Sequence, residues 1–412
     1  MITEEDPEAL TVPPKEEFLV SERVSIGGQY YFKAVADWRK AMGDNLVYAG
    51  FVQLYLDARP FEAFRFFGKV EAEYPFLLGE DALRVRELYA DFSIAPGVYG
   101  RVGKQTIAWG VGRYFSPADV LNLTPIDIDD PDAERVGPVA LKVHVSGFLS
   151  NFYVYVIAND VQSVSEVAFA PKFETVLGSA EIGLAGFYRF GMAPRLIAMA
   201  TFPLGQVDWY FELVASWGSD RTFADDSGGT YGVDDAVVFQ ATAGFNYKYV
   251  DPLGDFTFNA SGQFWFNGDG YEDPSLAILA KNDPRIVSKT ILPGDLEHPD
   301  RFYTALNVSL VDILGSGISV GSSWFGGLGG STGRVAPWIS YAFNEDFSVT
   351  GRVPVSYGAV GAEFSPFGFQ YAPTLEAKLF GNSTVSLSMP IVPASSSPTP
   401  FVLTLTLVKE RF

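Results

Sequence analysis

The sequence contains no cysteine and only two histidines, His144 and His298. Reactive thiols, zinc-thiolate sites and a disulfide-stapled fold are therefore excluded, and metal catalysis by a histidine cluster lacks its ligands. We expect neither a metal nor a cofactor. The longest apolar runs are about nine residues (196–204, for example), whereas a transmembrane helix needs about 20. The chain therefore cannot cross a membrane as a helix.

The 412 residues also lack a Ser/Gly linker, a low-complexity tract and any long helix-forming stretch. Aromatic residues make up 15% of the chain and glycine numbers 41, which favours one large all-β unit. The net charge is −20, and nucleic-acid binding requires a basic face, so no nucleic-acid partner is expected.

The acidic charge is concentrated in the N-terminal region and in three long segments. Residues 1–20 carry six acids and one base, and the segments 109–136, 218–236 and 267–300 together carry 18 acids and six bases. The rest of the chain is nearly neutral, with 25 acids against 22 bases. Since residues 1–20 also contain three prolines, we predict an acidic, flexible N-terminal segment before a single unit that covers 21–412.

The stretch from Asp255 to Asn267 shows a strict alternation. Its even-numbered residues are apolar or glycine, and its odd-numbered residues are polar, apart from Trp265. Successive side chains of a strand point to opposite faces, so one face suits hydrocarbon and the other suits water. A soluble half-buried strand usually alternates over five or six residues, whereas about 9–11 residues cross a bilayer at a tilt.

Strand-like runs of this kind recur along the whole chain. We count twenty, near 22–38, 47–58, 61–75, 82–94, 97–108, 137–146, 150–158, 168–176, 179–189, 194–203, 206–217, 237–250, 255–267, 301–312, 317–326, 333–343, 346–357, 372–380, 383–391 and 400–411. Closed bacterial barrels have an even number of strands, and a closed barrel satisfies every backbone group in lipid. The prediction is an all-β fold, a transmembrane antiparallel up-and-down β-barrel of about 18–20 strands (range 16–20).

The connections between these runs fall into two alternating series. One series is short, as at 59–60, 95–97, 204–205 and 251–254, whereas every long connection belongs to the other: 109–136, 218–236, 267–300 and 358–371. Short periplasmic turns and long extracellular loops are typical of outer-membrane barrels. We therefore expect an outer-membrane location and a signal peptide that has been removed.

Three prolines, Pro337, Pro354 and Pro390, fall inside the expected strands. Proline removes a hydrogen bond from the strand ladder. Bulges, strand ends near a rim or a different strand count would each account for them.

The run from Arg101 to Gly110, with Gly103-Lys-Gln followed by Trp109-Gly110, precedes Phe115-Ser-Pro-Ala-Asp119. It resembles the Gly-Arg/Lys-Gln-x3-Trp/Tyr-Gly strand of large porin-like outer-membrane families, including the alginate-export type, over about forty residues. In those families the strand leads into a long loop. The terminal Phe412 resembles the closing aromatic by which such barrels are recognised, which implies the barrel-assembly machinery as a partner.

Segment 109–136 is the candidate constriction loop. Ser116-Pro117-Ala118-Asp119 predicts a short helix through Leu123. Folded inward, the loop would place charged groups where ions pass. The candidate constriction residues are Arg113, Asp119, Asp127, Asp129, Asp130, Asp132 and Glu134. Two alternatives stay open: a solvated external loop, and a Ca²⁺ site on the Asp run, which lacks the glycine and terminal glutamate of an EF-hand. Asp273-Pro274-Ser275 predicts the start of another short helix.

Polar residues on the water-facing phase of the strands are candidates for the lumen lining. They are Arg65, Lys69, Glu71, Glu73, Glu87, Asp91, Lys142, His144, Asp208, Glu212 and Gln263. Both signs of charge occur side by side, so we expect weak intrinsic selectivity in the lumen. The acidic loops would favour cations or neutral solutes by raising the local cation concentration.

These features favour a porin-like channel for passive diffusion of small hydrophilic solutes, surrounded by outer-membrane lipid and either monomeric or a homotrimer. A closed barrel with a structural or surface-interaction role is the alternative. A third reading is enzymatic, because His144-Val-Ser146 resembles the His-x-Ser of outer-membrane lipid hydrolases. A serine nucleophile needs its base within hydrogen-bond reach and an orienting group, here Asn151 or Asn159. We assign no catalytic residue and expect no enzyme activity.

Overall fold

The computed structural model describes residues 18–21, 23–37, 46–74, 83–159, 161–281, 283, 291–380, 383–393 and 402–409. Its strands are β1 Phe18–Ser21, β2 Val24–Asp37, β3 Leu46–Phe61, β4 Phe64–Tyr74, β5 Leu83–Ala95, β6 Val98–Lys104, β7 Val139–Ser146, β8 Ser150–Ile157, β9 Ala168–Leu177, β10 Ala180–Phe187, β11 Arg195–Leu204, β12 Val207–Trp217, β13 Phe223–Ala224, β14 Thr230–Tyr231, β15 Val237–Val250, β16 Thr257–Asn267, β17 Phe302–Val311, β18 Ile318–Gly327, β19 Thr332–Ala342, β20 Phe347–Arg352, β21 Val355–Tyr357, β22 Gln370–Tyr371, β23 Thr374–Leu379, β24 Ser383–Ser388 and β25 Val402–Lys409. Its helices are α1 Ser275–Lys281 and the 3-10 turns η3 Val164–Glu166, η4 Pro293–Leu296 and η5 Ile313–Gly315.

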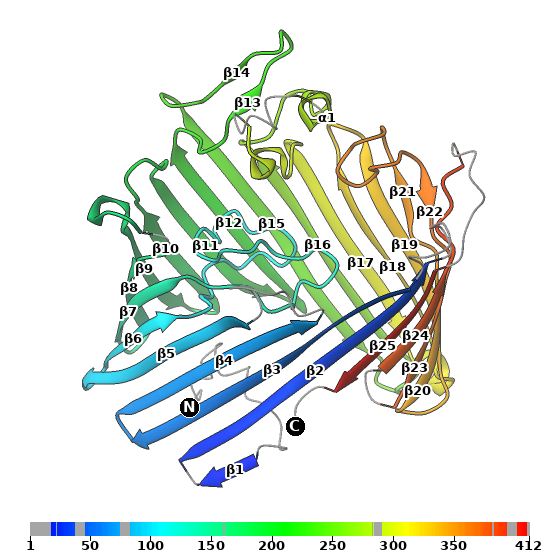
Figure 1. The fold of residues 1–412 in the computed structure, drawn as a ribbon, viewed down its shortest axis with the longest axis horizontal. Coiled ribbons are helices and arrows are strands. Elements are labelled where there is room, and N and C mark those ends of the chain that lie inside the picture. Colours follow the sequence, from blue (N-terminus) through cyan, green and yellow to red (C-terminus); the bar gives the residue numbers. More distant parts are fainter. Residues whose placement is uncertain are drawn as a thin grey trace.

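The strands form one closed antiparallel barrel (Figure 1). Each wall strand pairs with the next along the chain, and β25 pairs with β2 from Tyr30↔Lys409 to Asp37↔Val402, which closes the ring. β20 and β21 are two halves of one wall strand, because both pair with β19, and β22 and β23 are likewise halves of the next. The wall therefore has 20 strands, with β1 as a short addition beside β2 and β13–β14 as a separate hairpin.

The predicted fold class is confirmed. Each of the twenty expected runs corresponds to one wall strand, with ends that differ by a few residues. The predicted N-terminal segment, 1–20, lies almost entirely outside the described residues, apart from 18–20, which belong to β1.

The two faces of the wall differ as the alternation predicts. On β12, Phe211, Leu213 and Trp217 point outward and are exposed, whereas Glu212 and Val214 point inward and are buried. The exposed apolar side chains of the outer face are the surface that a lipid bilayer covers. Of the helices within the described ranges, none has the length and hydropathy to cross a membrane.

The two rims differ in their connections. Turns such as 62–63, 96–97, 147–149, 178–179 and 205–206 join strands at one rim. The other rim carries the long segments that contain β13, β14 and α1, which lie together at the upper end of Figure 1. The helix predicted from Asp273-Pro274-Ser275 is confirmed as α1, where Asp273 Oδ1 accepts the Ser275 amide at 3.0 Å. The Ser275 hydroxyl and amide lower the pKa of Asp273, so the cap persists until the pH falls through that lowered pKa.

Candidate functional site

The connection from β6 to β7, residues 105–138, lies inside the barrel and not beyond its rim (Figure 1). We call it the inner loop. It contains the whole predicted constriction segment, 109–136, and it contacts the lumen face of several strands that lie far apart around the ring.

An apolar anchor holds the first part of the inner loop. Ile107, Trp109, Ala118 and Leu121 are buried, and Trp109 is fully covered. They pack on lumen-facing residues of β7 to β12: Ala140, Tyr155, Ile157, Ala168, Ala170, Ala185, Phe187, Ile197, Met199 and Val214. None of these apolar residues is among the polar candidates predicted for the lumen lining. The inner wall is apolar and rich in alanine where the loop covers it, because the loop replaces water as its neighbour.

Glu212 is the polar anchor beside this apolar contact. Its carboxylate accepts the amides of Val111 and Gly112 at 2.6 Å each, the Ser116 hydroxyl at 2.8 Å and the Ala118 amide at 3.1 Å. The residue faces the lumen side, as expected of a lumen-lining candidate, but it is 2% exposed and does not meet the water of the bore. Four charge-assisted donors replace its hydration.

The helix predicted from Ser116 to Leu123 is wrong, since residues 117–118 form only a turn. The Ser116 hydroxyl donates to Glu212 instead of capping a helix, and the Ala118 amide does the same. Asn122 folds back to Ile107, donating to its carbonyl at 2.7 Å and accepting its amide at 3.1 Å. Tertiary partners thus take up the backbone groups that a helix would have paired.

A second anchor lies on β16, where Gln263 meets Tyr114 and Phe115. Gln263 Oε1 accepts the Tyr114 amide at 2.8 Å, and its Nε2 donates to the Phe115 carbonyl. The Phe115 ring stacks on Trp265 with centroids 5.2 Å apart and also contacts Tyr303. This contact explains why Trp265 occupies a polar phase of its strand: it faces the loop and not water.

The acidic half of the inner loop contacts two other parts of the inner wall. Glu134 lies 2.6 Å from Lys69 on β4, and Asp129 pairs with Arg334 on β19. Counted from β2, β4 is the third wall strand and β16 the thirteenth, so the Lys69 and Gln263 contacts lie on opposite sides of the 20-strand ring. The inner loop therefore crosses the bore.

The remaining constriction candidates have different surroundings. Asp132 pairs with Arg113 at 3.0 Å, and Asp119 pairs with Arg135. Burial lowers the pKa of the Arg135 guanidinium, against the opposing effect of Glu212. Asp127 and Asp130 are exposed. The structure thus brings the candidates onto one loop, where most serve as ionic ties and two face solvent.

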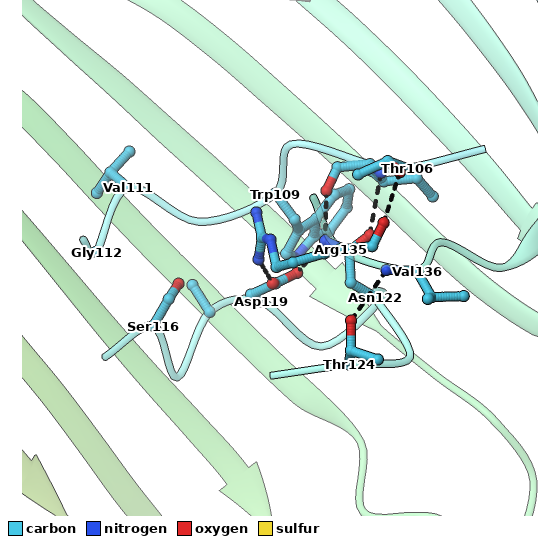
Figure 2. A network of polar contacts seen from close by, with 12 residues as sticks. Thr106, Trp109, Val111, Gly112, Ser116, Asp119, Asn122, Thr124, Arg135 and Val136 are labelled. Atoms are coloured by element: carbon cyan, nitrogen blue, oxygen red, sulfur yellow. Dashed lines mark hydrogen bonds and ion pairs between the residues drawn. The ribbon is translucent and has the colours of Figure 1, made fainter. Parts of the chain in front are cut away.

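The loop is held to itself by the network in Figure 2. Arg135 contributes an ion pair with Asp119, and its carbonyl accepts the Thr106 hydroxyl at 2.9 Å. Thr124 accepts the Val136 amide at 2.9 Å. These contacts join the entry and exit of the loop, so it is a folded insert with its own cross-links. Sequence reasoning missed Trp109, Phe115 and Arg135 as anchors, and the out-of-phase Trp265 signalled the contact with Phe115 alone.

The other lumen candidates mostly form ion pairs on the inner wall. Arg65 pairs with Asp57 at 2.9 Å and approaches Asp91 at 3.6 Å, and Lys69 lies 3.4 Å from Glu87. The same face carries Glu71 with Arg86, Glu73 with Arg84, Lys142 over Tyr153, and His144, while Asp208 is exposed near the turn 205–206. Positive and negative groups thus alternate on this part of the inner wall.

The hydrolase motif has a different arrangement from a catalytic pair. His144 Nε2 lies 2.9 Å from Asn151 Oδ1, and the His144 ring stacks on Tyr153. Within the described residues no hydrogen bond joins His144 to Ser146. Across the same ranges, no group of three or more His, Asp or Glu side chains is placed to hold a metal ion.

The long-rim segments meet the inner loop around Glu363. Its carboxylate accepts the Tyr303 hydroxyl at 2.7 Å and lies 2.7 Å from His298 Nδ1. Phe115 of the inner loop contacts the His298 ring edge-on at 6.1 Å. The segments 291–301 and 358–369 therefore support the inner loop from the side of the long connections.

No protein-family model matches the chain, and no curated protein matches its sequence. Several solved structures are similar to this chain over most of its length. Salmonella typhi OmpF in complex with daunomycin is 11% identical, with 94% of this chain and 97% of that chain covered and a TM-score of 0.42. OccK11 (OpdR) of Pseudomonas aeruginosa is 10% identical, with 94% and 96% covered and a TM-score of 0.46. A mutant of the Rh. blastica porin is 10% identical, with 94% and 99% covered and a TM-score of 0.42.

Proposed function

We propose that this protein is an outer-membrane channel for passive diffusion of small hydrophilic solutes. One observation carries the proposal: a folded loop is tied to opposite sides of the inner wall of a closed, lipid-facing barrel. Such a loop narrows a bore without using the barrel exterior, which is the arrangement a size-selective diffusion channel needs. In this reading the short turns are periplasmic and the long segments extracellular.

The finer part of the proposal concerns charge. The ion pairs around Arg65, Lys69 and Arg101 balance the inner wall, whereas Asp127 and Asp130 on the loop are exposed. Cations and neutral solutes would then enter more readily than anions, since an acidic vestibule raises the local cation concentration.

Planar-bilayer conductance of the purified protein tests the channel. We expect ion conductance from the native chain and a larger single-channel conductance when residues 109–134 are replaced by a short Gly/Ser linker, because the bore loses its insert. The matched control shortens 218–236 instead and should leave conductance within about twofold of the native value, since that segment lies at the rim.

A closed barrel with a surface role is the second candidate, and the tight packing of the inner loop against Glu212, Gln263 and Lys69 favours it. The same recording separates the two: a native chain that does not conduct, beside a linker variant that does, describes a plugged barrel. We also propose assembly through the C-terminal strand and, as one arrangement, a homotrimer, which chemical cross-linking in membranes would test. Phe412 lies outside the described residues.

A further inference from the structure

The wall between β19 and β24 has a hollow on its outer face, which we call the outer hollow. Its volume is about 620 Å³, within the range of about 300–1,000 Å³ that is typical of small-molecule sites. The outward side chains that line it are apolar and include Pro337, Ile339, Val353, Leu375, Leu387 and Met389. The hollow therefore lies on the opposite side of the wall from the inner loop.

The registers of the strands show that the hollow faces outward. On β19, Arg334 points into the barrel, because it pairs with Asp129 of the inner loop. Ile339 is five positions further along the strand and so lies on the other face. Ile339 pairs with Gly351, and Gly351 pairs with Leu375, so all three share the outer face. Ile339 is 57% exposed and Leu375 56% exposed.

Gly351 leaves the floor of the outer hollow open. A Cβ at this position would have one neighbour within 4 Å, Ile339 Cγ2 at 3.9 Å. Three outward glycines elsewhere in the wall are covered by a neighbouring ring: Gly100 by Phe92, Gly262 by Phe245 and Gly333 by Tyr357. An aromatic ring laid over a glycine fills the gap that the missing side chain leaves in a sheet. At Gly351 no protein ring takes that place.

The sides of the hollow are stiff. Pro337 and Pro373 carry closed rings, and Ile339 and Val353 are branched at Cβ, which restricts their rotation about χ1. Such residues cannot swing across Gly351 to fill the space. The hollow is therefore a built feature of the folded wall.

The outer hollow lies at the depth of lipid chains. Gly351 is four residues beyond Phe347, where β20 begins, and Leu375 is four residues before Leu379, where β23 ends, both at the short turns. At about 3.3 Å per residue and a strand tilt of about 40°, this places the hollow roughly 10 Å above the short-turn ends of the strands. Each half of the hydrocarbon core is about 15 Å thick, so the hollow belongs to the leaflet on the side of the short turns.

Packing, and not the hydrophobic effect, decides what occupies an apolar hollow in lipid. Bulk lipid chains are as apolar as the wall, so a site is favoured only where a chain gains more contacts than it has elsewhere. A chain lying over Gly351 between Ile339 and Leu375 gains contacts on three sides. The hollow offers no partner for a charged head group, because the arginine at its edge, Arg352, pairs with Glu376 at 3.2 Å.

We propose that the outer hollow binds one acyl chain of a phospholipid from the leaflet on the side of the short turns. The bound chain covers the level at which Pro337 and Pro373 cannot donate to the strand ladder, and so fills the wall where its own side chains do not. This inference goes beyond the proposed channel and does not depend on conductance.

Native mass spectrometry of the protein released from phospholipid nanodiscs tests the site by counting the phospholipids that stay bound. We expect the native chain to retain one phospholipid, and Gly351→Leu to retain it at least about threefold less often, because the new side chain occupies the floor of the hollow. Gly351→Ala should give an intermediate result. Ala200→Leu is the matched control: Ala200 pairs with the outward Phe211 on a distant part of the wall, and retention should equal that of the native chain.

The methyl group of Met389 reports on the hollow directly. In nanodiscs made with chain-protonated phospholipid, we expect nuclear Overhauser contacts between this methyl and the acyl chain, and weaker contacts in Gly351→Leu. Met199 is buried under the inner loop and should show none, so it serves as the internal control.

The results that would overturn the proposal are distinct from one another. Equal retention of phospholipid by the native chain and by both Gly351 variants would show that the hollow holds no particular chain. Retention of lipid A in place of phospholipid would refute the assignment to this leaflet. The sequence has no cysteine, so rapid disulfide dimerisation of Ile339→Cys in membranes would assign the face to a second copy of this chain.

Failure of this inference and failure of the proposed channel are separable. Gly351 lies outside the bore, so Gly351→Leu should conduct like the native chain, whereas absence of conductance in the native chain counts against the channel alone. Heat-modifiable gel mobility checks that each variant is folded. If Gly351→Leu does not fold, Gly351→Ala carries the comparison, since its Cβ fits the open space.

Discussion

At the scale of single residues, the inner loop depends on Glu212 and on two glycines that allow close approach to it. A Cβ on Gly110 would lie 2.6 Å from Glu212 Oε1, and a Cβ on Gly112 would collide with the Phe115 carbonyl. The buried carboxylate is tolerated because four donors surround it, and each donor is satisfied because the carboxylate is there. Neither side of this contact is stable without the other.

Replacing Glu212 with alanine should therefore release the loop without unfolding the barrel. The change leaves three backbone amides without their acceptor, at about 1–3 kcal/mol each if they stay buried. We expect trypsin to cleave at Arg113 or Arg135 at least about tenfold faster than in the native protein, since loosened segments are cleaved through their open state. Asp208→Ala, on the same face of β12 but exposed, is the control. Unchanged cleavage in Glu212→Ala would show that the apolar anchor alone holds the loop.

The sequence predicts which face of the wall a residue occupies. It does not predict whether water or the inner loop covers that residue. Alternation places Glu212, Gln263 and Trp265 on the inner face, because that depends only on strand geometry. Whether an inner residue meets water or a loop depends on contacts about 100 to 150 positions away in the chain, as between Val111 and Glu212 or Tyr114 and Gln263. A single sequence carries no local signal for such contacts.

At the scale of elements, a row of prolines crosses four neighbouring wall strands. Pro337, Pro354, Pro373 and Pro390 lie within one residue of the same level, as the registers of β19 to β24 show. Val353 donates to the Pro337 carbonyl, Ala372 to that of Pro354 and Met389 to that of Pro373, but proline cannot return the second bond of each pair. The barrel thus accommodates Pro337, Pro354 and Pro390, and the strand number predicted from the alternation does not change.

At the level of these four prolines, the outer face of the wall is also less filled by side chains. A hollow of about 620 Å³ opens there, with Gly351 between Ile339 and Leu375 among its lining residues. Missing ladder bonds and missing side-chain bulk coincide, so this band should be the part of the wall that opens most readily.

Hydrogen exchange in detergent tests this expectation. Amides at 353–357 should exchange at least about tenfold faster than amides in the middle of β16 and β17, where the ladder is complete. Pro337→Val restores one donor toward Val353, worth about 1 kcal/mol, and should slow exchange there by about fivefold. Ile339→Val changes the same strand without adding an N–H and should have little effect. Equal exchange in the band and in β16 would show that neighbouring contacts compensate fully for the prolines.

The positions of the strands and the closure of the barrel were the features that the sequence predicted best. Strand positions follow from alternation and from turn composition, and closure follows from the backbone's need for partners in lipid. The short helix expected at Ser116 is absent because its capping residues donate to Glu212, whereas the helix at Asp273 forms and the Asp273 carboxylate accepts the Ser275 amide. Local capping rules predict a helix correctly where tertiary contacts do not take up the capping groups.

For the whole molecule, the distribution of charge separates a balanced bore from an acidic rim. The lumen pairs cancel one another, whereas Asp226, Asp234 and Asp235 of the long segment 218–236 are exposed. Under a KCl gradient the reversal potential should show a cation preference. That preference should shrink between 0.1 M and 1 M salt, because the screening length falls from about 10 Å to about 3 Å.

Changing Asp226, Asp234 and Asp235 together to asparagine should reduce the preference at 0.1 M and hardly alter it at 1 M, while single-channel conductance at 1 M stays the same. Asp91→Asn, which breaks a lumen pair and leaves Arg101 in excess, should instead shift the preference toward anions at both salt concentrations. A clear anion preference in the native protein would contradict the charge-based part of the proposal while leaving the channel itself in place.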